Sequence, residues 1–114
     1  MGILVSTMRM MTLLSMKSRI EFQMMEKTSQ MSDLTERICE QDEYIGDLDS
    51  DSPEAKALEA EKRRLNKLEG KLKREQQELQ TRYQEITQEL QACQQMLSSN
   101  IQSGFFTYGM QGGR

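Results

Sequence analysis

Apolar residues recur along this chain in steps of three and four, which is the spacing of one buried stripe on an α-helix. In the first half, two seven-residue series interleave: Met10, Lys17, Met24, Met31, Ile38, Ile45 and Leu13, Ile20, Lys27, Leu34, Gln41, Leu48. The polar members at positions 17, 27 and 41 weaken the stripe but keep its period. The pattern predicts a long helix over about residues 3–46.

A second helix is predicted over about residues 53–103, and its stripe is more regular. The predicted intrachain seam consists of Leu58, Leu65, Leu72, Leu79, Ile86, Leu90 and Leu97, and Cys93 continues the same seven-residue series. The partner positions 62, 69 and 76 are polar, so the stripe is thin near residue 60 and full from residue 79 onward. Gly70 interrupts the helix at a cost of about 1 kcal/mol relative to Ala.

The stretch between the two patterns contains a helix stop and a helix start. Gly46 is expected to end the first helix in the left-handed conformation. Ser52, Pro53 and Glu54 match an N-cap, a first-turn proline and an acid near the positive helix end. The predicted fold is all-α, an antiparallel two-helix hairpin or coiled coil. It is a single domain, 1–114, with a turn at 47–52 and a Gly/aromatic tail at 104–114.

Charge supports this pairing. Residues 33–51 hold eight acids and one base, a net of −7, whereas residues 54–82 hold nine bases and six acids, a net of +3. Opposite blocks attract each other if the chain folds back between them. A hairpin places them side by side, and the sign pattern then favours antiparallel pairing over slipped registers.

The opening segment is apolar on more than one side of the predicted helix. Ten of the first sixteen residues are Met, Ile, Leu or Val, and seven of the ten Met lie in residues 1–25. One partner helix covers only one side, so other molecules must cover the rest. The tail holds a second apolar cluster. We therefore expect a self-assembly or partner interface at Ile3, Leu4, Met8, Met11, Leu14, Phe22, Met25, Phe105, Phe106 and Tyr108.

Composition gives no support for catalysis. The 114 residues include no His and no Trp, only two Cys, and no Cys/His spacing that fits zinc. We expect no enzyme activity, no cofactor and no metal. The basic run at 61–74 is diluted by acids and lacks aromatic residues, so nucleic acid is not an expected partner. Cys39 and Cys93 are too far apart in a hairpin to bond.

The segment at the start does not match a membrane or export signal. It is shorter than the roughly 20 apolar residues of a spanning helix. It also lacks the basic region and cleavage site of a secretory signal. Residues 1–6 do fit the pattern M-G-x-x-x-[ST], which leaves lipidation of Gly2 open. We expect synthesis in the cytoplasm without a cleavable signal, with export to the cell surface or beyond as an option.

Some residues match features of a known protein family. Asp51-Ser52-Pro53-Glu54 forms the turn, Leu58 follows it, and Asn100-Ile101-Gln102-Ser103-Gly104-Phe105 closes the second helix. In these features the chain resembles the subunits of bacterial type III secretion needles and filaments. It departs from them in its greater length and in the Gly-rich tail beyond the Phe. The resemblance implies a helical polymer with the termini buried toward its axis.

Two functions follow from these patterns. The leading hypothesis is a structural coiled-coil subunit that self-assembles into a filament or tube of the secretion-needle type. The alternative is a small coiled-coil chaperone or adaptor that binds a partner's amphipathic helix through residues 3–25. The expected partner is thus a second copy of the chain or another coiled-coil protein. Membrane contact ranks last, because only Arg9, Lys17 and Arg19 accompany the apolar segment.

Overall fold

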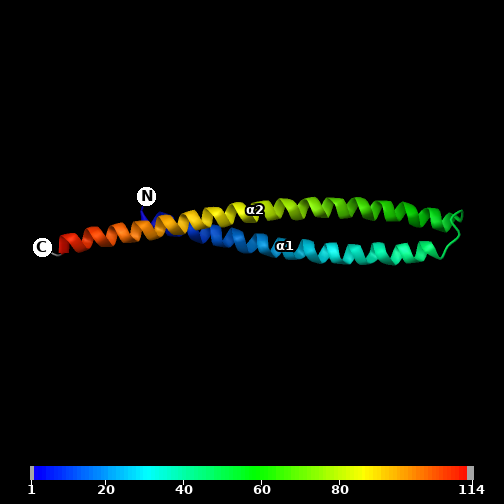
Figure 1. Ribbon diagram of the computed structural model, residues 1–114, viewed down its shortest axis with the longest axis horizontal. Coiled ribbons are helices and arrows are strands. Elements are labelled where there is room, and N and C mark those ends of the chain that lie inside the picture. Colours follow the sequence, from blue (N-terminus) through cyan, green and yellow to red (C-terminus); the bar gives the residue numbers. More distant parts are fainter. Residues whose placement is uncertain (1, 113–114) are drawn as a thin grey trace. The chain divides into compact units, whose positions relative to one another are not determined.

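The computed structural model describes the backbone of residues 2–112 and the side chains of residues 2–102. The described residues form two α-helices, α1 (Ile3–Gly46) and α2 (Pro53–Gly112), and no strand. The chain divides into two compact units. The first unit is Met1–Glu21 with Thr81–Arg114, and the second unit is Phe22–Gln80. Within each unit α1 and α2 run side by side in opposite directions (Figure 1). The predicted all-α antiparallel pairing is therefore confirmed.

The core of the second unit is a narrow row of leucines. Leu34 of α1 packs with Leu65 and Leu72 of α2, and Met31 and Ile38 pack against this cluster. Leu65 is only 2% exposed. Burying one such side chain contributes about 1.5–3 kcal/mol. Because the row is one side chain wide, each leucine supplies a large part of the packing in its section of the pair.

The first unit repeats this arrangement. Leu13 and Ile20 of α1 are buried with Ile86, Leu90 and Cys93 of α2. In both units, every position of the stripes predicted from the sequence is buried or half-buried, including the polar ones. The predicted seven-residue period is confirmed, and the seam is the core of the molecule.

The predicted start of α2 is also confirmed. The Oγ of Ser52 accepts a hydrogen bond from the backbone N–H of Ala55 at 3.1 Å, and the carbonyl of Ser52 accepts the N–H of Lys56 at 3.2 Å. Ser52 is therefore the N-cap, with Pro53 at the first helical position and Glu54 in the first turn. These three residues fix where the chain re-enters a helix after the turn.

The prediction that Gly46 ends α1 in a left-handed conformation is wrong. The helix does end at Gly46, but no glycine among the described residues has a positive φ. The last carbonyls are satisfied by tighter bonds instead: the N–H of Asp47 donates to Tyr44 at 3.2 Å, and that of Leu48 donates to Ile45 at 3.1 Å. Such bonds over three residues close a helix end without a left-handed residue.

The predicted end of α2 at residue 103 is wrong as well. The helix continues through Gly104 to Gly112 and takes up most of the predicted tail. A single glycine costs about 1 kcal/mol in a helix interior. That cost alone does not end a helix, and no proline follows. The predicted interface residues Phe105, Phe106 and Tyr108 have side chains outside the described ones.

Opposite charges join the helices of the second unit. Near the turn, the Nζ of Lys62 in α2 forms a salt bridge with the carboxylate of Asp42 in α1. Farther from the turn, the Nζ of Lys27 in α1 lies 2.5 Å from a carboxylate oxygen of Glu75 in α2. The acidic stretch of α1 therefore lies beside the basic start of α2, as the sequence predicts. Exposed pairs of this kind contribute about 0–1 kcal/mol each, so they set the register more than the stability.

The leucine row gives a direct stability prediction. Leu65→Ala should lower the free energy of unfolding by about 2–5 kcal/mol, because it leaves a cavity in a seam with no second layer. Leu68→Ala, three residues along the same helix and 39% exposed, should lower it by only about 0.5 kcal/mol. Urea unfolding followed by circular dichroism measures both. Equal losses for the two variants would contradict the assignment of the seam.

Candidate assembly surface

The start of α1 is buried on one side only. In the first unit, Ser6 and Leu13 face the seam and are 6% and 1% exposed, and Met10 is half-buried. Seven other large apolar side chains in residues 3–16 are open to solvent. We call these the N-terminal apolar face. Its members and exposed fractions are Ile3 45%, Leu4 73%, Val5 49%, Met8 60%, Met11 64%, Leu14 43% and Met16 38%.

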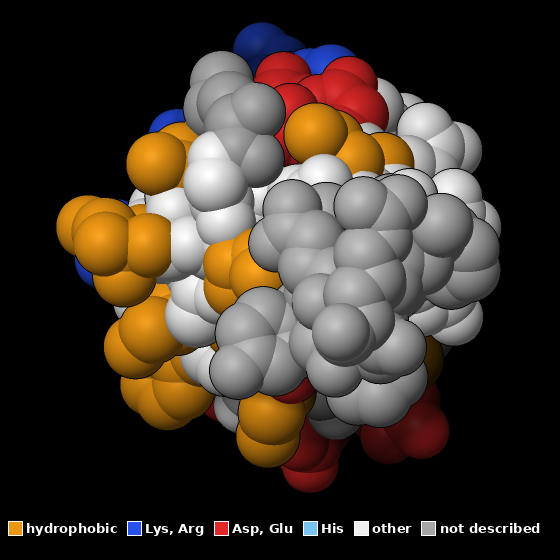
Figure 2. Space-filling model, turned by 90° about the vertical axis from the view of Figure 1, so that its left-hand side faces the viewer, with side chains coloured by type: hydrophobic (Ala, Val, Ile, Leu, Met, Phe, Trp, Pro, Cys, Tyr) orange, Lys and Arg blue, Asp and Glu red, His pale blue; other side chains and the backbone are white. Residues whose placement is uncertain are grey.

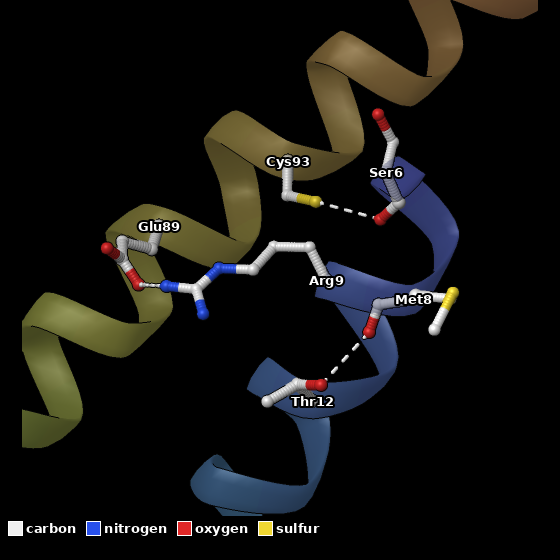
Figure 3. A network of polar contacts seen from close by, with 6 residues as sticks. All are labelled: Ser6, Met8, Arg9, Thr12, Glu89 and Cys93. Carbon is white, nitrogen blue, oxygen red and sulfur yellow. Dashed lines mark hydrogen bonds and ion pairs between the residues drawn. The ribbon is translucent and has the colours of Figure 1, made fainter. Parts of the chain in front are cut away.

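The most exposed members lie along one side of the helix. Leu4, Met8 and Met11 are spaced by four and three residues, so they lie one above the other on α1. Figure 3 shows the side chain of Met8 pointing away from α2, whereas that of Arg9 reaches toward it. Figure 2 faces the end of the first unit and shows apolar side chains gathered along one side of it. The arrangement leaves several large side chains in water.

Polar contacts hold this part of α1 against α2. The Cys93 thiol donates to the backbone carbonyl of Ser6 at 3.2 Å, and a guanidinium nitrogen of Arg9 lies 3.0 Å from a carboxylate oxygen of Glu89 (Figure 3). The ammonium of Lys17 lies 5.8 Å from the centre of the Tyr83 ring, within the range of cation–π attraction. These contacts fix the rotation of α1, and thereby turn the N-terminal apolar face outward.

A groove of about 340 Å³ lies between the helices of the first unit. Four residues of each helix line it: Val5, Ser6, Arg9 and Leu13 from α1, and Glu89, Ala92, Cys93 and Met96 from α2. Val5 and Met96 at its rim are 49% and 53% exposed. The groove is suited to receive an apolar side chain from another molecule.

The structure places the other predicted interface residues in different settings. Phe22 and Met25 are exposed, at 63% and 70%, but they belong to the second unit. The predicted seam residues lie on the inner sides of the helices. Leu65, Leu72, Leu79, Ile86 and Leu90 are buried, and Leu58 and Leu97 are half-buried. The first unit therefore brings Ile3, Leu4, Met8, Met11 and Leu14 together on one segment.

Several buried or groove-lining residues of the two units were not singled out from the sequence. Ser6 lies seven residues before Leu13, and Ala55, which is 1% exposed, lies seven residues before Lys62. Extending each stripe by one repeat would have found both. Val5 and Met96 at the groove have no such signal, because they lie off the stripes and only the paired helices bring them together.

Two carboxylates have shifted acidities. The side-chain contact with Lys27 holds the pKa of Glu75 below its ordinary value of 4.5, and the charges of Lys71 and Arg74 act in the same direction. The pKa of Glu61 is lowered by its hydrogen bonds with Arg64. Both carboxylates lie in the second unit and face bases, so they act as structural anions. Among the described residues, no group of three His, Cys, Asp or Glu side chains is placed to hold a metal ion.

Comparisons with protein families, curated proteins and solved structures found no match to this chain. Neither helix, over the residues described, has an apolar stretch long enough to cross a membrane.

The Lys27–Glu75 pair predicts a specific response to acid. Because the folded pKa of Glu75 is lowered, its stabilising effect is full above 4.5 and is lost as the pH falls through the folded value. Glu75→Gln should therefore destabilise the protein at neutral pH and much less well below 4.5. The exposed Glu78→Gln on the same helix is the control and should show no such change. Urea midpoints at the two pH values measure this, and a pH-independent effect of Glu75→Gln would contradict it.

Proposed function

We propose that this protein is a structural coiled-coil subunit that self-assembles through its N-terminal apolar face into a larger helical bundle or filament. The observation that supports the proposal is the exposure of Leu4, Met8 and Met11, at 73%, 60% and 64%. Their helix already has its one intrachain neighbour, so only another molecule can cover them. A contiguous apolar patch on a protein surface commonly marks an interaction site.

The energetics favour many contacts over a single one. Covering one large apolar side chain contributes about 1.5–3 kcal/mol, whereas association costs roughly 4–15 kcal/mol in lost freedom and ordering. Three such side chains together contribute about 4.5–9 kcal/mol, which does not exceed that range of costs. An assembly in which each copy contacts several others covers the whole face and adds the groove. This is why we favour a bundle or filament over a simple dimer.

The sequence resemblance gives the proposal a more specific form. A turn of the type Asp51-Ser52-Pro53-Glu54 and an Ile followed by a Phe near the C-terminus resemble features of secretion-needle subunits. In the first unit, Ile101 is 50% exposed and lies on α2. It is available to join the assembly contact. We therefore propose a bacterial filament of the needle type as the first assembly to look for.

A second candidate function is supported by the groove of the first unit. An adaptor or chaperone needs a depression for a partner's apolar side chain and a surface that adapts to it. The groove between Val5 and Met96 is such a depression. The methionines of the N-terminal apolar face form a surface that adapts to a partner, because their side chains are flexible. In this function a partner's amphipathic helix takes the place of the neighbouring copies.

Point substitutions test the proposal better than a truncation. Removing residues 1–16 would also delete Leu13 and the carbonyl that accepts the Cys93 thiol. We instead propose Met8→Gln with Met11→Gln. Each loses apolar burial in the assembly, so the concentration needed to assemble should rise about tenfold or more. The thermal melt of the helices at low concentration should stay the same, because both side chains are exposed.

The matched control is Glu85→Gln with Gln88→Asn, two exposed polar positions on α2 in the same unit, outside the N-terminal apolar face. Pelleting and negative-stain microscopy at rising concentration measure assembly. The control should assemble like the unmodified protein, and high salt should not dissolve the assembly, because apolar burial is not screened. Unchanged assembly of the Met variant would overturn the proposal. If the unmodified protein stays monomeric at all concentrations, the adaptor function takes its place.

A further inference from the structure

The second unit carries two stripes of opposite charge, one on each helix. The acidic stripe of α1 consists of Asp33, Glu36, Glu40 and Glu43. The basic stripe of α2 consists of Arg64, Lys67, Lys71 and Arg74. All eight side chains are exposed, and both stripes have the same spacing of three, four and three residues. Each stripe therefore follows one side of its helix.

The two stripes point in opposite directions. Each acidic residue lies two positions beyond a seam residue of α1, namely 31, 34, 38 and 41, and each basic residue lies two positions beyond 62, 65, 69 and 72 of α2. Two residues correspond to a rotation of about 200° around a helix. Both stripes therefore lie on the side away from the seam, and they occupy opposite outer surfaces of the paired helices.

The stripes are also level with each other along the pair. The Lys62–Asp42 and Lys27–Glu75 salt bridges fix the register of the second unit. In that register Glu40 lies close to the level of Arg64, Glu36 to that of Lys67, and Asp33 to that of Lys71. A second copy placed alongside, pointing the same way, presents its basic stripe to the acidic stripe without any shift along the axis.

We propose that the acidic stripe of one copy docks on the basic stripe of a second copy that points in the same direction. This inference rests on the proposed self-assembly and adds the surface and the orientation of one contact. Two different surfaces meet, so one copy keeps its basic stripe free and the other keeps its acidic stripe free. Such a contact repeats without end or closes into a ring. Charge complementarity of this kind fixes orientation and register more than affinity.

A groove of about 690 Å³ lies between the helices, along one edge of the acidic stripe. Its lining consists of Asp33, Glu36 and Glu40, the seam residues Leu34 and Leu72, and Leu68, Gln30 and Arg37. Lysine and arginine bury their aliphatic stems on apolar surface while their charges reach carboxylates. Arg37 is the one base in this lining, and its positive charge is attracted to the carboxylate of Glu61 in α2.

The basic stripe is free to change partners. Lys67 and Arg74 form no salt bridge within the described part of the chain. Arg64 forms a salt bridge with Glu61 on the same helix. The Nζ of Lys71 lies 4.0 Å from a carboxylate oxygen of Glu75, also on the same helix. Exposed pairs of this kind contribute about 0.3–0.5 kcal/mol, so exchanging them for pairs with a second copy costs little.

Chemical cross-linking tests the contact. In a Cys39→Ser background, which removes the exposed thiol and keeps the buried Cys93, we propose Glu36→Cys and Lys67→Cys as separate variants and as a double variant. A short bismaleimide should join the two single variants to each other when they are mixed. Neither single variant should form dimers alone, and the double variant should form a ladder of dimers, trimers and larger species. The background protein, treated in parallel, measures any reaction of Cys93.

Thr35→Cys is the matched control for Glu36→Cys. Thr35 is exposed and next to Glu36 in the chain, but it is rotated by about 100° around the helix, off the acidic stripe. It should not join to Lys67→Cys. Dimers formed by either single variant alone, or equal joining at Thr35→Cys, would overturn the inference.

Pelleting of the same samples separates the two proposals. Assemblies that pellet but do not cross-link between positions 36 and 67 would contradict this contact and leave the proposed self-assembly standing. A chain that neither pellets nor cross-links contradicts both. Cross-linked ladders from protein that also pellets would support both.

Discussion

The constraint on which the rest of this structure depends is that each helix has a single intrachain neighbour. A seam one side chain wide buries Leu13, Leu34, Leu65 and Leu72, and it offers no second layer. Any apolar side chain that does not face the seam must stay in water or be covered by another molecule. Where α1 is apolar on more than one side, the fold therefore creates an exposed surface that it cannot remove by itself.

The seam also contains polar residues, and their side chains are accommodated in different ways. Lys27 reaches Glu75, Lys62 reaches Asp42, and Lys17 lies over the Tyr83 ring. The Oε1 of Gln41, by contrast, is buried without a hydrogen-bond partner. Unsatisfied groups of this kind cost about 1–3 kcal/mol. The charged residues in the seam of the second unit thus set the register of the helices at some cost in stability. The first unit has a more apolar seam and also an apolar outer face.

Much of the fold could be predicted from the sequence because its period is regular. The seven-residue repeat located the seam positions except Ser6 and Ala55, each one repeat before the predicted stripe, and Ser52, Pro53 and Glu54 located the start of α2. The left-handed conformation at Gly46 and the end of α2 before Gly104 were mispredicted, because a glycine permits a left-handed stop but does not require one. The groove residues Val5 and Met96 could not be found, since their proximity depends on how two distant segments rotate against each other. The opposite directions of the charged stripes were implicit in the period but needed the observed seam to be recognised.

The account joins two kinds of surface with different physical roles. Apolar burial at residues 3–16 supplies affinity that salt does not screen, and the charged stripes of the second unit supply direction. Amide hydrogen exchange measured by mass spectrometry at low and high protein concentration tests the central claim most directly, because an exposed helix segment exchanges more slowly once neighbours cover and stabilise it. The account predicts that peptides from residues 3–16 become strongly protected as concentration rises. Exchange of these peptides that is the same at every concentration would contradict it.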